Sequence, residues 1–317
     1  MTAQQAKRVQ RLQRKADADI AADGNVIPMW RRHLKEVLHS PSCVISIAVI
    51  VIMLLFSFVG PFFSPYQQNG LDIINAKQAP TVAHLLGTDE YGRDILTRLM
   101  YAGRISLTVG LASMALSLII GTVIGLVCGY YGGWVDATIM RLADLLMSIP
   151  GLPLLIIIAA MLSSFKVPPE SRLYIVMLML SLIGWPGLAR MVRSEVLSLR
   201  EQLYMKAADA LGLGTHSKMF HHLLPNVYPL LIVVATLSTA SSILSESTLS
   251  FLGMGVMPPN ASWGNMISAA NNMIDFQKRW WLWIPPGTAI LVTVIAINVL
   301  GNRLQDILDP KSERSAA

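Results

Sequence analysis

The sequence predicts an all-α, polytopic membrane protein with six transmembrane helices, and three observations lead to this fold class. Of its 317 residues, 53% are hydrophobic and only 14% are charged, whereas soluble domains carry about 25% charged residues. The mean hydropathy is +0.52. The apolar residues gather in six runs that approach the roughly 20 residues a helix needs to cross a bilayer. These runs lie near residues 43–60, 105–129, 145–165, 173–189, 227–245 and 280–301.

Residues 1–41 precede the first run and are predicted to form a basic cytoplasmic tail. A secretory signal has a short charged region followed early by an apolar core. Here the first apolar run begins only at Cys43, so we expect no cleaved signal. Residues 42–310 are expected to form the transmembrane domain, and residues 311–317 a short C-terminal tail. The N-terminal tail contains eight Lys or Arg: Lys7, Arg8, Arg11, Arg14, Lys15, Arg31, Arg32 and Lys35.

The first two runs are free of charge but differ in length. Residues 43–60 make 18 residues, about 27 Å as a helix, which is just enough to span. Residues 105–129 make 25, so this helix is expected to tilt or project. It contains Gly121, Gly125 and Gly129, and small residues at this spacing let helix backbones approach closely. We expect a helix contact there, either within this chain or toward a second subunit.

The third and fourth runs contain prolines. Pro150 and Pro153 interrupt the third run, and Pro186 lies near the end of the fourth, which is short. Proline removes a backbone hydrogen bond, and transmembrane helices tolerate it where other groups satisfy the freed backbone. These three positions are therefore predicted bending points.

The distribution of basic residues predicts that both chain ends lie in the cytoplasm. With the N-terminus inside, the inner segments hold 17 of the 25 Lys and Arg, as the positive-inside rule requires. The net charge of +6 is therefore assigned to topology and to anionic membrane lipid, and no nucleic-acid partner is expected. Trp280, Trp281 and Trp283 begin the sixth run, where an interfacial aromatic belt belongs. This orientation puts the polar segment 201–226 in the cytoplasm.

Segment 201–226, EQLYMKAADALGLGTHSKMFHHLLPN, is the longest polar interruption in the second half of the chain. Residues 204–211 are rich in good helix formers, and Met205, Ala208 and Leu211 are expected to share one face of the helix. A short amphipathic helix between two spans is either a passive interfacial helix or a docking element that a partner grips.

The chain is expected to turn after this helix and to restart another. Gly212 and Gly214 give it a place to stop and turn. Pro225 is expected to begin the next helix, because proline is tolerated in a first turn.

The segment resembles the EAA signature of ATP-binding-cassette (ABC) importer permeases. The matching residues are Lys206-Ala207-Ala208, Gly212 four residues after Ala208, and Leu224-Pro225. The run from His222 to Asn226, HLLPN, is similar to the dipeptide/oligopeptide/nickel branch of that family. Lys206 stands where the signature has glutamate, which weakens the case for a salt bridge from this position.

The resemblance implies the type I ABC importer permease fold and a role for the helix near residues 204–214. In that family it is the cytoplasmic coupling helix, which sits in a cleft of the ATPase subunit. The residues that the resemblance assigns to ATPase coupling are Tyr204, Lys206, Ala207, Ala208, Ala210, Leu211, Gly212, His222, Leu224, Pro225 and Asn226.

Residues 87–98, GTDEYGRDILTR, resemble the stretch that precedes the second span in the same branch. In this outer loop Asp89, Arg93, Asp94 and Arg98 are expected either to form a hydrogen-bonded network that fixes the loop or to make a solvated face. Asp94 and Arg98 are four residues apart, which suits an ordinary helical ion pair.

Ionisable residues near the spans are costly unless they face protein or water. Glu246 lies in a run, ESTLSFLG, that is similar to the family's ESxLSFLG. We expect it to face the central pathway or a structural network, with an exposed interfacial position as the alternative. Asp144 and Arg141 begin the third span, where an ion pair at the inner interface is favoured over a substrate site. Arg190 and Arg193 are interpreted as topological anchors first and gate residues second.

No catalytic or metal site is predicted. The sequence has no P-loop of the form GxxxxGK[ST] and no Gly-x-Ser-x-Gly elbow. His221 and His222 are adjacent and point to different faces of a helix, so they cannot chelate one metal well. Cys43 and Cys128 lie in apolar runs and are interpreted as small buried residues. The chain is therefore expected to be no enzyme and to hold no cofactor itself.

The resemblance implies half of the transmembrane pathway of a peptide importer in a bacterial inner membrane. The implied partners are a second similar permease, two ATPase subunits that bind ATP and Mg, and an extracytoplasmic solute-binding protein, which the loop 252–283 would face. Nickel or another small solute is the alternative cargo. The competing class is a stand-alone secondary transporter, which should carry paired broken spans and midplane acids. Beyond Glu246 and Asp144 the sequence offers few such acids.

Overall fold

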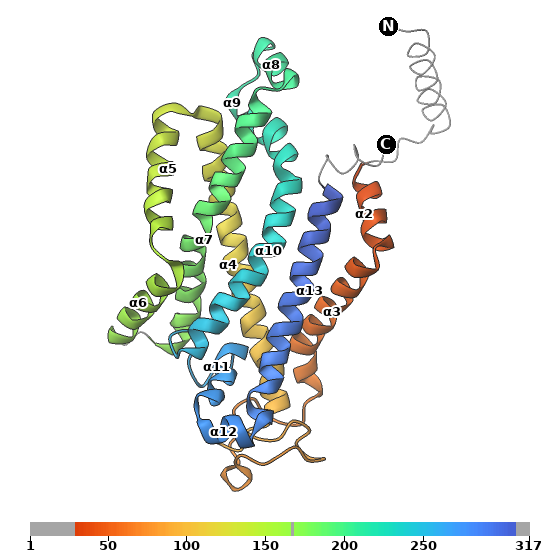
Figure 1. Cartoon of the computed structure of the whole chain (residues 1–317), viewed down its shortest axis with the longest axis vertical. Coiled ribbons are helices and arrows are strands. Elements are labelled where there is room, and N and C mark those ends of the chain that lie inside the picture. Colours follow the sequence, from red (N-terminus) through yellow and green to blue (C-terminus); the bar gives the residue numbers. More distant parts are fainter. Residues whose placement is uncertain (1–28, 166–167, 309–317) are drawn as a thin grey trace.

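Five long helices run roughly along the length of the molecule in the computed structural model (Figure 1), which describes residues 29–165 and 168–308. They are α3 (Pro41–Phe58), α4 (Ile95–Tyr131), α7 (Pro169–Arg200), α10 (Leu224–Phe251) and α13 (Ile284–Leu308), and each is long and apolar enough to cross a membrane. No strand occurs within the described ranges, where only an isolated bridge joins Thr88 and Asp94. Residues 1–28 of the basic tail and the tail 311–317 lie outside the described residues.

The third predicted span, residues 145–165, is divided into two helices, as its interruption by Pro150 predicted. Its residues divide between α5 (Gly133–Ser148) and α6 (Gly151–Ser164), and the two helices are bent by 82°. The bend is at Ile149, which has extended backbone angles because the proline that follows disfavours the helical region. Pro153 lies in the first turn of α6, where its missing N–H is harmless. The described part of the chain reaches six spans when this bent pair counts as one.

The remaining helices extend beyond the predicted spans. Helix α4 begins at Ile95, ten residues before the predicted start, and α7 continues through Pro186 to Arg200. The last span begins later than predicted, because the tryptophans at 280 and 281 form a separate 3-10 turn, η5 (Trp280–Leu282). Polar residues at the ends of α4 and α7 therefore belong to the same continuous helices as the apolar runs.

The three glycines of the second span pack within the chain, against α7. A Cβ atom added at Gly125 would lie 2.6 Å from the Cβ of Val192, a distance that side chains do not adopt. The same relationship joins Gly121 to Leu188 and Gly129 to Val196. The glycines were expected to contact a helix either within this chain or in a second subunit, and the structure shows the contact within the chain.

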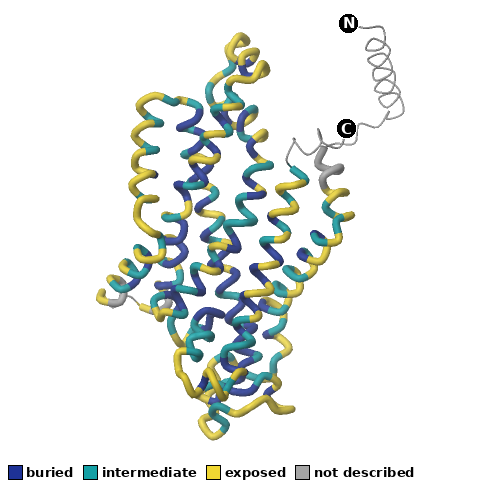
Figure 2. The backbone as a smooth tube through the Cα atoms, in the orientation of Figure 1, coloured by how far each residue is buried: buried dark blue, intermediate teal, exposed yellow. Residues whose placement is uncertain are grey.

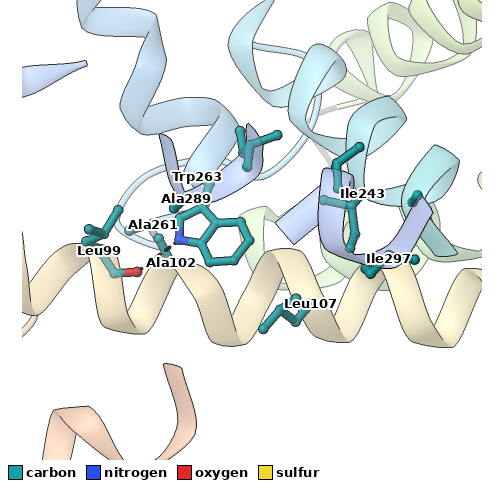
Figure 3. Packing of buried hydrophobic residues seen from close by; sticks show 11 residues of the cluster. Leu99, Ala102, Leu107, Ile243, Ala261, Trp263, Ala289 and Ile297 are labelled. Carbon is teal, nitrogen blue, oxygen red and sulfur yellow. Dashed lines mark hydrogen bonds between the residues drawn. The ribbon is translucent and has the colours of Figure 1, made fainter. Parts of the chain in front are cut away.

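A buried tryptophan fastens the last loop to the bundle. Trp263 begins the short helix α11 (Trp263–Ile267) and packs among residues of α4, α10 and α13, including Ala102, Ile243 and Ala289 (Figure 3). Its indole Nε1 donates to the Leu99 carbonyl at 3.1 Å. The loop therefore joins the hydrophobic core of the bundle.

The two ends of the bundle carry different structures (Figure 1). One end carries α8 (Leu203–Ala210), much of which is exposed (Figure 2). The opposite end carries the loop between α3 and α4 together with α11 and α12 (Met273–Lys278). Helix α2 (Met29–His39) and the C-terminal end of α13 lie toward the α8 end. Segment 201–226 and the loop that contains residues 87–98 thus lie at opposite ends.

Candidate functional site

Helix α8 is fixed to the bundle by one face. Met205 and Ala208 are buried, and Met205 joins a core cluster that includes Val196 of α7 and Leu223. Asp209 accepts a hydrogen bond from Lys218 Nζ at 2.7 Å. These contacts hold α8 against the end of α7 and against the segment that leads into α10.

Leu211, which was expected on the same helix face as Met205 and Ala208, is not buried with them. Its side chain is 79% exposed, because α8 ends at Ala210 and Leu211 is the C-cap residue. Gly212 follows with φ of +69°, in the left-handed region that favours glycine, and reverses the chain direction there.

The outer face of α8 presents apolar side chains to solvent. Leu203 is 83% exposed and Tyr204, the next residue of α8, is exposed as well; Phe220 of η3 is also exposed. Partial burial, and then the nearby Glu195 carboxylate, raise the pKa of the Tyr204 hydroxyl above its ordinary value. Lys206, Ala207 and Ala210 are exposed as well, and Lys206 lies 3.8 Å from Glu201.

The prediction that Pro225 lies in the first turn of a new helix is confirmed, because α10 (Leu224–Phe251) begins one residue before it. The helical conformation itself begins earlier, at Thr215. Helix α9 (Thr215–Ser217) continues into a π-helical turn, η3 (Lys218–Leu223), and then into α10. Pro225 has no N–H to donate to the preceding turn, and a π turn accommodates such a gap. Asn226 Nδ2 donates instead to the His222 carbonyl at 2.6 Å. Leu224 packs against the cluster that contains Met205, whereas Pro225 and Asn226 are exposed.

The expected ion pair between Asp144 and Arg141 is replaced by pairs between helices. Asp144 accepts from Arg190, and Asp136 accepts from Arg193 through both of its oxygens. Both acids lie on α5 and both arginines on α7, so the arginines tie the two helices together. The packing of α5 on α7 therefore determines the ion-pair partners of Asp136 and Asp144, and the spacing of charges along α5 does not.

Glu246 belongs to a buried structural network, which was one of the two positions expected for it. Its carboxylate accepts from Ser106 Oγ at 2.9 Å and from Ser250 Oγ at 2.7 Å, with Ser247 Oγ at 3.4 Å. Ser106 in turn accepts from the backbone N–H of Trp263 at 3.1 Å. The fully buried carboxylate therefore joins α4 and α10 to the last loop.

In the loop between α3 and α4, the Asp89 carboxylate contacts two arginines. It accepts from Arg93 Nε at 2.7 Å, and Arg98 Nε lies 3.4 Å away. It also accepts from the backbone N–H groups of Tyr91 at 2.9 Å and Arg93 at 3.0 Å. The side chains of Asp89, Arg93 and Arg98 are 7–16% exposed, so they form a network inside the protein and no solvated face.

Asp94 does not pair with Arg98, contrary to the prediction from their spacing. It is the N-cap of α4, where it accepts from the Thr97 backbone N–H at 2.8 Å and the Thr97 hydroxyl at 2.7 Å. His84 Nδ1 lies 3.0 Å from its other oxygen. An N-cap carboxylate satisfies free N–H groups of the first turn, which outcompetes the helical ion pair.

A serine-lined hollow of about 300 Å³ was missed from the sequence. It lies among α4, α6, α7 and α10, and its polar lining comes chiefly from α10. The spacing of these serines, at three, four and seven residues, was the available signal, because it puts hydroxyls on one face of an apolar helix. The serines that α10 contributes are Ser238, Ser241, Ser242 and Ser245.

No group of three or more metal-ligating side chains occurs among the residues that the structure describes.

A family model described as "Binding-protein-dependent transport system inner membrane component" matches residues 121–314. A second, described as the N-terminal TM domain of oligopeptide transport permease C, matches residues 28–80.

Curated relatives cover nearly the whole chain. The dipeptide transport system permease protein of Alkalihalophilus pseudofirmus is 35% identical over 282 residues, 89% of this chain and 90% of its own. The oligopeptide transport system permease protein of Bacillus subtilis is 34% identical over 285 residues, 90% of each chain. The glutathione transport system permease protein of Pectobacterium atrosepticum is 33% identical over 297 residues, 93% of this chain and 96% of its own.

These matches confirm the resemblance drawn from residues 87–98, 201–226 and 246–253. The first family model covers more than half of the chain, and each of these relatives is aligned along most of its own length. The chain thus belongs to the family of binding-protein-dependent transport system inner membrane components, and it is a multi-pass membrane protein.

Proposed function

We propose that this chain forms half of the transmembrane pathway of an ABC importer that takes up peptides. The names of the relatives support peptide cargo, because they include dipeptide, oligopeptide and glutathione permeases. The observation that carries the proposal is the geometry of α8, which is anchored by Met205 and presents exposed Leu203 and Leu211 beyond the bundle.

In this proposal α8 is the coupling helix and passes mechanical work from separate ATPase subunits to the spans. A partner that grips the apolar outer face would move α8, and the packing of Met205 against Val196 and Leu223 would carry that displacement into α7 and α10. Helix α10 bears the serine face, so its movement would open or narrow the hollow. ATP and Mg would bind only to the partner subunits, of which we infer two, together with a second permease and a solute-binding protein.

The proposed orientation puts the α8 end, and with it both chain termini, in the cytoplasm. The excess of Lys and Arg in the segments assigned to that side supports it. Accessibility labelling of the variant Ala207→Cys tests this, since Cys43 and Cys128 are buried and should react slowly. We expect an impermeant maleimide to label inverted vesicles and to leave intact cells unlabelled. Labelling in intact cells would overturn the orientation and the coupling role together.

The coupling role is tested by Leu211→Asp in the full transporter reconstituted with its ATPases. The side chain makes no buried contact, so we expect normal insertion but loss of ATPase co-purification and of ATP-driven uptake of a dipeptide. The matched control is Val82→Asp, because Val82 is 97% exposed on the opposite end of the bundle. The control should keep its ATPases. Equal retention of ATPase in both variants would contradict the proposal.

A further inference from the structure

A hollow of about 710 Å³ lies at the end of the bundle opposite α8. It opens between the loop that contains residues 77–98 and the segment 250–282, and it is within the size range of about 300–1,000 Å³ that is typical of small-ligand sites. Three basic and three acidic side chains line it, together with apolar groups such as Met257 and Leu282. The charged lining residues are Lys77, Asp89, Glu90, Arg93, Arg98 and Asp275.

Most of these charges are neutralised within the protein. Asp275 accepts from Lys77 Nζ at 2.9 Å and pairs with Arg279. Arg98 donates to Asn69 Oδ1 at 3.0 Å and to the Gln68 carbonyl at 3.3 Å, in addition to its ion pair with Asp89. These residues build the walls and leave little capacity for a ligand.

Two opposite charges are left over. Asp89 alone serves both Arg93 and Arg98, so one carboxylate faces two guanidinium groups. Within the described chain, the side chain of Arg93 hydrogen-bonds only through its Nε, and its guanidinium lies 4.6 Å from the centre of the Tyr91 ring. Glu90 is exposed and has no ion pair or hydrogen bond to another described side chain. The hollow thus offers the Glu90 carboxylate, whose interaction within the described chain is electrostatic attraction to Arg98, and the Arg93 guanidinium with unused Nη donors.

We propose that this hollow binds short peptides through their charged termini, which rests on the proposed peptide transport. The ammonium group of the peptide would donate to Glu90, and its carboxylate would accept from the Nη groups of Arg93. Charge-assisted hydrogen bonds of this kind are about twice as strong as neutral ones, and a guanidinium fork fits a carboxylate. The apolar wall at Met257 and Leu282 would accept the peptide side chains. The site would receive peptide before it enters the serine-lined hollow.

The test measures equilibrium binding to the transporter in lipid nanodiscs without the solute-binding protein. The probes are the dipeptide Ala-Ala, its N-acetylated form and its C-terminal amide. We expect both modified peptides to bind the wild-type transporter at least about tenfold more weakly, as the loss of one charged contact implies. Glu90→Gln should abolish the preference for the free amine and keep the preference for the free carboxylate.

The matched control is Asp72→Asn, because Asp72 is an exposed acid of the same loop that does not line the hollow. It should keep both preferences. Undiminished preference for the free amine in Glu90→Gln, or wild-type binding that ignores acetylation, would overturn the site. ATP-driven uptake of Ala-Ala supplied by the binding protein is measured in parallel. If uptake persists but binding shows no preference for free peptide termini, this site alone is rejected. If the ATPases are active but no peptide is taken up, the proposed function is rejected.

Discussion

Gly125 of α4 lies directly against Val192 of α7, so close that any side chain on the glycine would overlap the valine. We expect Gly125→Val to destabilise the chain by at least about 1–3 kcal/mol, since extra carbon atoms in a packed contact force the helices apart. Thermal unfolding in detergent measures this. Gly187→Ala is the matched control, because a Cβ there meets nothing within 4 Å and alanine favours the helix. Equal stability of the two variants would contradict the close packing.

Glu246 is expected to stabilise the contact of α4 and α10 with the last loop, through the serines that donate to it. Glu246→Leu would leave the buried hydroxyls of Ser106 and Ser250 without their acceptor. Each unsatisfied hydroxyl should lower the free energy of unfolding by about 1–3 kcal/mol. Glu246→Gln keeps one carbonyl acceptor and should lose less. The midpoint of thermal unfolding separates the two. If leucine and glutamine are equally tolerated, the network has no structural role.

The ion pairs of Asp275 with Lys77 and Arg279 should make the stability of the folded chain depend on pH. Burial alone would raise the pKa of Asp275, but hydrogen bonds and positive charges from Lys77 and Arg279 outweigh it and hold the pKa below its ordinary value. The folded state therefore binds the proton less readily than the unfolded state. These ion pairs stabilise the protein above the unfolded pKa of about 3.9, and this contribution is lost as the pH falls through the lower folded value.

Asp275→Asn should therefore unfold at a lower temperature than the wild type at pH 6, and the difference should shrink as the pH falls below about 4. Thermal unfolding of the purified chain at several pH values measures it. A difference that stays constant down to pH 3 would show that Asp275 contributes through shape and not through its charge.

The sequence predicted what depends on composition and local spacing. Five of the six apolar runs lie in the long helices, and the helix at Leu203–Ala210 begins and ends within two residues of the residues 204–211 expected from helix propensity and the following glycine. Pro150 was correctly identified as an interruption. The 82° angle was not predictable, because it depends on how α6 packs against its neighbours.

Partner choice among charged residues was not predictable from spacing. Asp94 and Arg98 have helical spacing, but Asp94 is the N-cap and turns toward the first turn of α4. Asp144 pairs across two helices with Arg190, a partner that only tertiary packing supplies. The serine face of α10 was visible in the sequence as spacing, yet the hollow that gives it meaning requires α4, α6 and α7 in place.

The serine face leads to a last prediction, on the pathway itself. Ser242→Leu puts an apolar side chain into the hollow of about 300 Å³. It also removes a hydroxyl that could form hydrogen bonds with a peptide backbone. We expect several-fold slower ATP-driven uptake of Ala-Ala, with normal thermal stability and ATPase co-purification, because Ser242 is only partly buried. Ser164→Leu is the control, since Ser164 is an exposed serine of α6 outside this lining. Uptake that slows equally in both variants would point to a general effect of leucine and would remove the hollow from the pathway.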